Sequence, residues 1–128
     1  MGMAAMVRFD AEEFLRHASE DEYSYVLEGR LGALLGEDVV FAEAGNLVFK
    51  PRQQWHTFWN AGDGPCRILE ILSPGGFERL FAEMAADPDA MSGDAAQAMD
   101  LGYGVEVDYE SIPHLCAQHG LSFPAVSP

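Results

Sequence analysis

The central part of the chain alternates between short apolar runs and turn residues. The runs are rich in aromatic and β-branched side chains, and Gly, Asn, Asp or Pro separates one run from the next. This pattern predicts six strands, at Tyr23–Leu27, Leu31–Leu35, Val39–Ala42, Leu47–Lys50, Trp55–Trp59 and Arg67–Leu72. Short strands with close spacing are typical of an antiparallel sandwich or barrel, so we expect a mainly β fold.

The two ends of the chain have a different periodicity. Apolar residues recur at helical spacing from Phe77 to Ala86, which predicts an amphipathic helix. Two more short helices are predicted at Gly93–Met99 and Ser111–Gly120, the latter with Ser111 as its cap and a proline in its first turn. Near the N-terminus, Asp10–Ala18 has the pattern of a capped helix.

The composition is that of one small globular domain with an acidic surface. The chain has 128 residues and a formal net charge of -14, from 21 acidic and 7 basic side chains. Such a charge repels phosphate backbones and anionic lipid, so we expect no nucleic-acid or membrane partner. No apolar stretch approaches the roughly 20 residues that span a bilayer, and the opening residues lack a secretory signal. Two widely separated cysteines, expected as free thiols, favour a cytoplasmic location.

Two spaced patterns of Gly, His, Glu, Pro and Asn resemble the two motifs of the cupin family. The second motif, G-x5-P-x-G-x2-H-x3-N, is matched by Gly45, Pro51, His56 and Asn60, with Gln53 in place of the middle glycine. This substitution predicts either a different backbone path at that point or a glutamine accommodated in a type I turn.

The first cupin motif, G-x5-H-x-H-x3-4-E-x6-G, is matched in its latter half. Glu22 and Gly29 take the places of its glutamate and last glycine. His17 stands at the second histidine, whereas Leu15 stands at the first and supplies no metal ligand. The resemblance therefore extends over roughly residues 15–76.

The resemblance implies a cupin double-stranded β-helix, or jelly-roll barrel, that is short at its N-terminal end. We expect an N-terminal segment (1–21) that is partly helical or a swapped strand, a barrel core (22–76) and a helical C-terminal extension (77–128) that packs on the barrel. Few residues precede Glu22, so the barrel needs another strand at its edge. Met3–Phe9, in its own sheet or a partner's, and Gly104–Asp108 are the candidates. A homodimer would also cover this edge.

In cupins the residues of these motifs hold a divalent metal, which implies His17, Glu22 and His56 as metal ligands. Two histidines and a carboxylate also form the facial triad of non-heme iron enzymes, and Mn, Ni and Zn accept the same donors. The chain most resembles small quercetin-dioxygenase-like cupins. This implies an oxygenase-like activity on a small molecule, with Glu22 as a catalytic base.

A different class of function stays open beside this one. Leu15 and the short N-terminal end favour a metal-free barrel that binds or senses a small molecule without catalysis. A third interpretation is an interaction module in which the acidic helical tail binds a partner.

Strand alternation predicts which side chains line a ligand pocket. If His56 faces the barrel interior, Gln54, Phe58 and Asn60 face it too, and an inward Glu22 brings Ser24 inside. The opposite faces then carry Trp55, Thr57 and Trp59 on the His56 strand and Tyr23, Tyr25 and Leu27 on the Glu22 strand. These need a cover, for which the helix beginning at Phe77 and a partner subunit are the candidates.

Each candidate metal ligand has an alternative structural role. His56 has the alternative of a hydrogen-bonded core histidine. Glu22 has that of one member of a solvated acidic cluster with Glu20 and Asp21. If a helix forms up to residue 18, His17 lies at its end and favourably meets its dipole instead of binding a metal. Asn60 is expected to close a turn with its side chain.

Overall fold

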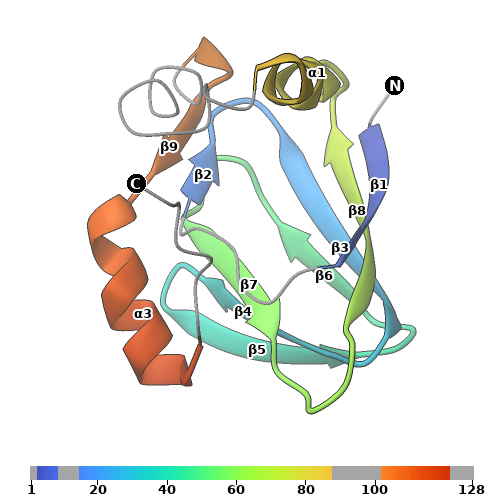
Figure 1. Cartoon of the computed structure of the whole chain (residues 1–128), viewed down its shortest axis with the longest axis vertical. Helices are drawn as coiled ribbons and strands as arrows, with labels where there is room; N and C mark the ends of the chain where they lie inside the picture. The colour runs from blue at the N-terminus through green and yellow to red at the C-terminus, as the bar shows by residue number, and fades with distance from the viewer. Residues whose placement is uncertain (1–2, 9–14, 88–101, 122–128) are drawn as a thin grey trace.

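A computed structural model of the chain describes residues 3–8, 15–87 and 102–121. In these residues two antiparallel sheets face one another (Figure 1), with strand orders β1-β8-β3-β6 and β5-β4-β7-β2-β9. The strands are β1 (Met3–Arg8), β2 (Leu15–His17), β3 (Asp21–Glu28), β4 (Arg30–Leu35), β5 (Asp38–Glu43), β6 (Leu47–Lys50), β7 (His56–Asn60), β8 (Arg67–Ser73) and β9 (Val105–Val107). The helices are α1 (Glu78–Ala86) and α3 (Ile112–His119), and a 3-10 turn (Tyr109–Ser111) precedes α3.

The strands and helices predicted from the apolar pattern largely agree with this structure. All six predicted strands are confirmed as β3 to β8, and the helices predicted from Phe77 and from Ser111 are confirmed as α1 and α3. The helix predicted at Gly93–Met99 lies outside the described residues. Neither described helix is long and apolar enough to cross a membrane.

The helix predicted over Asp10–Ala18 is wrong in its described part. Leu15–His17 is a strand, β2, which pairs with β7 on one side and β9 on the other. Leu15 and His17 point inward and are buried, while Arg16 faces outward and forms a 2.9 Å ion pair with Glu106. Pairing with strands that lie far away in the sequence therefore outweighs the local helical pattern.

The strands that complete the barrel edge come from both ends of the chain. β1 pairs with β8 and β9 pairs with β2, all within one chain. Both candidate segments of the sequence analysis thus supply a strand, one to each sheet. The sheets therefore include strands from outside residues 22–76.

The barrel interior has an apolar layer at each end and a polar layer between them. On β8, Ile68, Glu70 and Leu72 all point inward and are buried. Ile68 belongs to one apolar cluster, together with Val26, Leu31, Ala33, Ala42, Val48, Phe58 and Cys66. Leu72 belongs to a second cluster, together with Leu15, Phe77, Leu80 and Val105. Glu70 lies between the two clusters, at the level where the candidate ligands are found.

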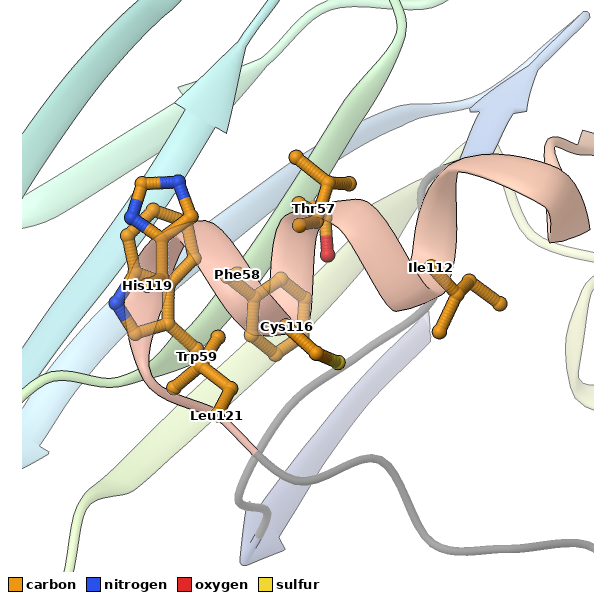
Figure 2. A pocket seen from close by; sticks show the side chains of 8 residues that line it. Thr57, Phe58, Trp59, Ile112, Cys116, His119 and Leu121 are labelled. Carbon is orange, nitrogen blue, oxygen red and sulfur yellow. The ribbon is translucent and has the colours of Figure 1, made fainter.

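Helix α3 lies along the outer face of the five-stranded sheet (Figures 1 and 2). It covers Thr57 and Trp59, which are both buried although they point away from the interior. The indole of Trp59 stacks on the ring of His119 at 4.4 Å. It also fills the space beside Gly32, where an added Cβ would lie 2.4 Å from the indole.

The need for a cover over this face is confirmed, but the expected covering element was wrong. The helix beginning at Phe77 does not lie there. Phe77 and Leu80 instead join the second apolar cluster, and α1 closes that end of the barrel (Figure 1). Their apolar side chains meet the interior edges of β2 and β8, so α1 buries its face against the end of the barrel rather than its side.

Three residues in turns were assigned a role from the sequence, and the structure tests each assignment. Gln53 adopts a φ of 65°, the left-handed conformation that glycine takes freely. The backbone therefore keeps a glycine-like conformation at this position, and both predicted alternatives, a different backbone path and a type I turn, are wrong. Asn60 closes its turn as predicted, since it donates to the carbonyl of Gly64 at 2.9 Å. Ser111 does not cap α3, because its hydroxyl donates to the carbonyl oxygen of Asp108 at 2.8 Å.

Candidate metal centre

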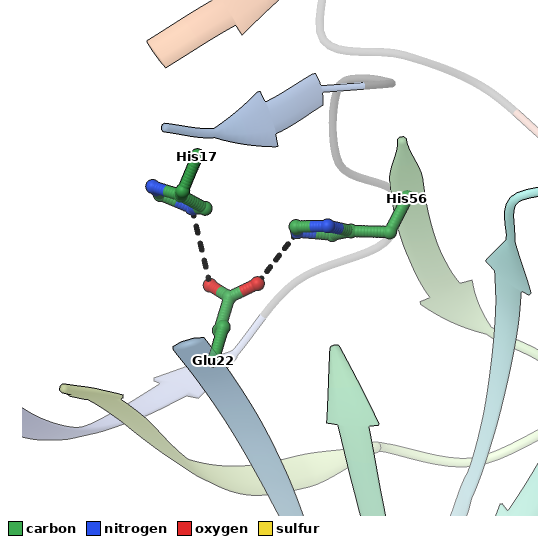
Figure 3. A group of neighbouring side chains, drawn as sticks. All are labelled: His17, Glu22 and His56. Atoms are coloured by element: carbon green, nitrogen blue, oxygen red, sulfur yellow. Dashed lines mark ion pairs between the residues drawn. The ribbon is translucent and has the colours of Figure 1, made fainter. Parts of the chain in front are cut away.

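Three strands bring His17, Glu22 and His56 together in the polar layer of the interior (Figure 3). His17 ends β2, Glu22 is the second residue of β3, and His56 begins β7. The three side chains are buried, with exposed fractions of 3%, 4% and 1%. Each offers one ligand atom, and these atoms lie within 4.8 Å of one another. The structure thus assembles all three residues predicted as metal ligands into one site.

The ring of His56 is oriented by the backbone next to it. Its Nδ1 lies 3.2 Å from the carbonyl oxygen of Gln54, which can only accept, so Nδ1 carries the proton. Its Nε2 then points into the site and lies 2.6 Å from Oε2 of Glu22. Two lone pairs at this distance repel unless a proton or a metal cation lies between them.

His17 is held as a neutral imidazole with one nitrogen toward Glu22. Its Nε2 lies 3.9 Å from Oε1 of Glu22, and its Nδ1 lies 3.7 Å from Oε2 of Glu20. The edge of the Phe77 ring packs against it at 4.9 Å. Burial lowers the pKa of His17 to about 4, against the opposing effect of Glu22. A neutral imidazole is the form that binds a metal.

Two atoms that meet in this site lack the hydrogen bonds that buried polar atoms usually make. In the described part of the chain, Oε2 of Glu22 and Nε2 of His56 have no partner in hydrogen-bonding geometry, and the same holds for Nδ1 of His17, which faces Glu20. Burial alone would raise the pKa of Glu22, but the charge of Lys50 and the contact with His56 outweigh it and hold that pKa below its usual range. Two imidazole nitrogens and an ionised carboxylate that converge within 4.8 Å fit a divalent cation.

Two more buried charges border the site, and the sequence analysis missed them. Lys50 faces Glu22 across the β3–β6 pair, and Glu70 faces Ser24 across the β3–β8 pair. The Nζ of Lys50 lies 3.1 Å from Oε2 of Glu22, 2.5 Å from Oε1 of Glu70 and 2.7 Å from the Ser24 hydroxyl. Burial raises the pKa of Glu70, and the contact with Lys50 opposes this.

A sequence signal for these two charges exists. Glu70 interrupts the apolar run of β8, and Lys50 ends the apolar strand β6. Alternation from Val48 puts Lys50 inside, just as alternation from Ile68 puts Glu70 inside. A charge at an inward position of a strand indicates a buried partner, so the pattern predicts an internal ion pair without naming its members.

The residues predicted to line a pocket divide into two groups. Ser24 and Phe58 lie in the interior, and the Phe58 ring lies 4.1 Å from the Nζ of Lys50. Gln54 and Asn60 are only partly buried. Gln54 contributes its backbone carbonyl to His56, and the side-chain amide of Asn60 closes the following turn.

The alternative role of Glu22 as part of a solvated acidic cluster is wrong. Glu22 is buried, whereas its neighbour Asp21 points outward and pairs with Arg52 at 3.2 Å. Strand alternation separates these adjacent acids onto opposite faces of the sheet. Glu20, just before β3, lies beside His17 instead.

Together these observations define a small antiparallel β-barrel with a His, Glu and His cluster in its interior. The sequence model of the Cupin domain family matches residues 7–72, more than half of the chain. The chain therefore belongs to the cupin family. No curated protein matches the sequence.

Solved structures share the fold at low sequence identity. KdgF from Halomonas sp. is 20% identical with a TM-score of 0.52, over 61% of this chain and 73% of that one. A conserved protein with a double-stranded β-helix domain from Klebsiella pneumoniae is 18% identical with a TM-score of 0.54, over 59% and 69%. A salicylate 1,2-dioxygenase variant from Pseudoaminobacter salicylatoxidans is 21% identical with a TM-score of 0.52, over 56% of this chain and 22% of the enzyme. These likenesses support the cupin fold alone.

Proposed function

We propose that this cupin binds a small molecule in its barrel interior and holds one divalent metal on His17, Glu22 and His56. The observation that carries the proposal is the convergence of two buried imidazole nitrogens and a buried carboxylate oxygen within 4.8 Å. Of these atoms, Nε2 of His56 and Oε2 of Glu22 lack partners in hydrogen-bonding geometry. Lys50 already places one positive charge 3.1 Å from Oε2 of Glu22, but a buried ligand atom without a hydrogen bond, such as Nε2 of His56, still costs free energy. A metal ion would remove that cost.

Iron, manganese, nickel and zinc all suit this ligand set, and the bound metal supplies Lewis-acid polarisation or, in the case of iron, oxygen activation. Glu22, ionised at neutral pH, would accept a proton from a substrate hydroxyl. The Phe58 ring and the apolar layers exclude water from the interior. An oxygenase-like reaction, as in the dioxygenase of similar fold, is the activity we propose to test.

Metal analysis of purified protein tests the metal site directly. After incubation with each salt and desalting, wild-type protein should hold about one metal ion per chain. His56→Ala should lose it, because only two ligands remain. His114→Ala, on the exposed surface of α3, is the matched histidine control and should keep the metal. Equal metal content in all three proteins would place the ion elsewhere, and no metal in any of them would refute the proposal.

A metal-free barrel that binds or senses a small molecule is the second candidate. Two observations favour it. Leu15 occupies the place of the first motif histidine and packs in an apolar cluster, and the ammonium of Lys50 already contacts Glu22. If the metal analysis shows no ion, thermal-shift screening with small aromatic acids and sugars becomes the appropriate next experiment.

We also propose that the protein is a homodimer that buries the outer face of its four-stranded sheet. This face carries Tyr23 and Tyr25 on β3 beside Phe49 and Leu47 on β6. Tyr25, Leu47 and Phe49 are 38%, 57% and 47% exposed, and Tyr23 stacks on Phe49 at 5.0 Å. A contiguous apolar face of this kind is typical of a protein–protein interface.

A further inference from the structure

A buried ammonium group lies beside the candidate metal site and is already paired with one of its ligands. The side chain of Lys50 is fully buried, and its Nζ contacts three oxygens of the polar layer. These belong to Glu22 and Ser24 on β3 and to Glu70 on β8. Three partners match the three N–H donors of an ammonium group, so Lys50 is held in place rather than offered to a substrate.

The contact with Glu22 involves the same oxygen that faces His56. Oε2 of Glu22 lies 2.6 Å from Nε2 of His56 and 3.1 Å from Nζ of Lys50. A metal ion on the three predicted ligands would bind this carboxylate, which the ammonium group of Lys50 already contacts. Lys50 and the metal are therefore two cations that share one buried carboxylate.

Electrostatics makes this sharing unfavourable for the metal. Two positive charges a few ångströms apart repel strongly in a site that water does not screen, with an interaction worth several kcal/mol even at an effective dielectric constant near 20. Glu70 offsets part of the ammonium charge through its contact with Nζ, and the Ser24 hydroxyl donates to the other oxygen of Glu70 at 2.7 Å. Lys50, Ser24 and Glu70 thus form one unit, which we call the lysine clamp.

We propose that the lysine clamp is a positioning device that sets the affinity of the metal site, with Lys50 as an internal cation competing with the metal for Glu22. This inference rests on the metal site of the proposed function. A purely structural ion pair would make no difference to metal affinity beyond the stability of the fold. The clamp instead predicts that removal of the ammonium strengthens metal binding.

The test compares metal affinity in variants with and without the ammonium group of Lys50. Lys50→Met alone would leave two buried acids unpaired and is expected to be destabilised. The double variant Lys50→Met/Glu70→Gln removes the cation together with its partner acid, keeps similar side-chain volumes and leaves Glu22 intact. Glu70→Gln alone is the control, because it alters the same region but keeps the ammonium beside Glu22.

Isothermal titration with Mn²⁺ and Zn²⁺ measures the dissociation constants, and circular dichroism reports whether each variant is folded. The double variant should bind at least about tenfold more tightly than wild-type protein. Glu70→Gln should bind no more tightly than wild type. If the double variant does not fold, Lys50→Gln/Glu70→Gln, whose amides can hydrogen-bond to Ser24, replaces it with the same expectation.

Each outcome separates the inference from the proposed function. Equal or weaker binding by the double variant, with wild-type binding that depends on His56, overturns the clamp and leaves the metal site standing. Equal tightening by Glu70→Gln alone also overturns it, since the ammonium is still present there. If the double variant binds metal through His56 and the wild-type protein binds none, the result supports the clamp and favours the metal-free function. No binding by any variant refutes both.

Discussion

At the scale of single residues, burial and nearby charges together decide which ionisable side chains carry a charge in the barrel interior. His17 and Glu22 face each other across the site, yet burial drives the histidine toward its neutral form while Lys50 keeps the glutamate ionised. The two groups thereby reach the protonation states that a metal requires before any metal binds. Their neighbours in space, not in sequence, set these states.

The lowered pKa of His17 predicts that the metal-free protein loses stability in mild acid. The unfolded chain binds a proton at His17 below its ordinary pKa of 6.5, whereas the folded chain does so only near pH 4. Stability from this residue is therefore complete above pH 6.5 and is lost as the pH falls toward 4, by about 3 kcal/mol in all. Urea unfolding at pH 7, 5.5 and 4 measures the effect.

His17→Gln is the control for this pH dependence, since glutamine does not titrate in this range. The variant should show a flatter decline of its free energy of unfolding between pH 7 and 4, while the decline that comes from other groups should remain. Parallel profiles for the two proteins would mean that His17 does not titrate with the lowered pKa.

At the scale of elements, the packing of α3 on the five-stranded sheet depends on one small residue. Gly32 on β4 lies opposite Trp59 on β7, and the indole occupies the space that a side chain at residue 32 would need. His119 of α3 then covers the indole from outside (Figure 2). A glycine inside a strand thus makes room for the tryptophan that joins sheet and helix.

Gly32→Ala is predicted to lower the free energy of unfolding by about 1–3 kcal/mol, because the new methyl group overlaps the indole. Gly62→Ala is the matched control. An added Cβ there has its nearest neighbour at 3.5 Å, an ordinary contact, so its effect should be much smaller. Chemical denaturation measures both, and tryptophan emission reports whether Trp59 becomes exposed. Equal stability of the two variants would contradict this account of the packing.

The element scale also shows which parts of the fold the sequence could predict. The six central strands follow from the alternation of apolar and polar residues, which depends only on neighbouring positions. β2 could not be predicted in this way. Its three residues are too few for a pattern, and it is a strand because β7 and β9 pair with it on both sides.

At the scale of the whole molecule, the two sheets differ in how their outer faces are covered. α3 lies on the five-stranded sheet, whereas Tyr25, Leu47 and Phe49 of the four-stranded sheet are exposed. The sequence predicts a dimer on two grounds, a barrel edge short of strands and an outward apolar face. β1 and β9 add strands to the two sheets within one chain, so the support for a dimer is the exposed apolar face.

Phe49→Lys is predicted to convert the dimer to a monomer, because it would bury a charge in the centre of the apolar interface. Phe41→Lys is the control, since Phe41 is 52% exposed but lies on the other sheet. Sedimentation velocity at micromolar concentration should give dimer mass for wild type and Phe41→Lys, and monomer mass for Phe49→Lys. A monomeric wild-type protein would end the proposal.

The amino-acid sequence by itself determined the central strands, the alternation of faces along each of them, and the family to which the chain belongs. Each of these depends on the order and spacing of nearby residues. The structure then showed that Glu22 and His56 face inward. Only the tertiary structure decided that His17 lies on a strand and meets the other two ligands, and that Lys50 and Glu70 share the interior with them. Alternation predicts which side of a strand a residue faces, but strand pairing across the chain decides which residues it meets there.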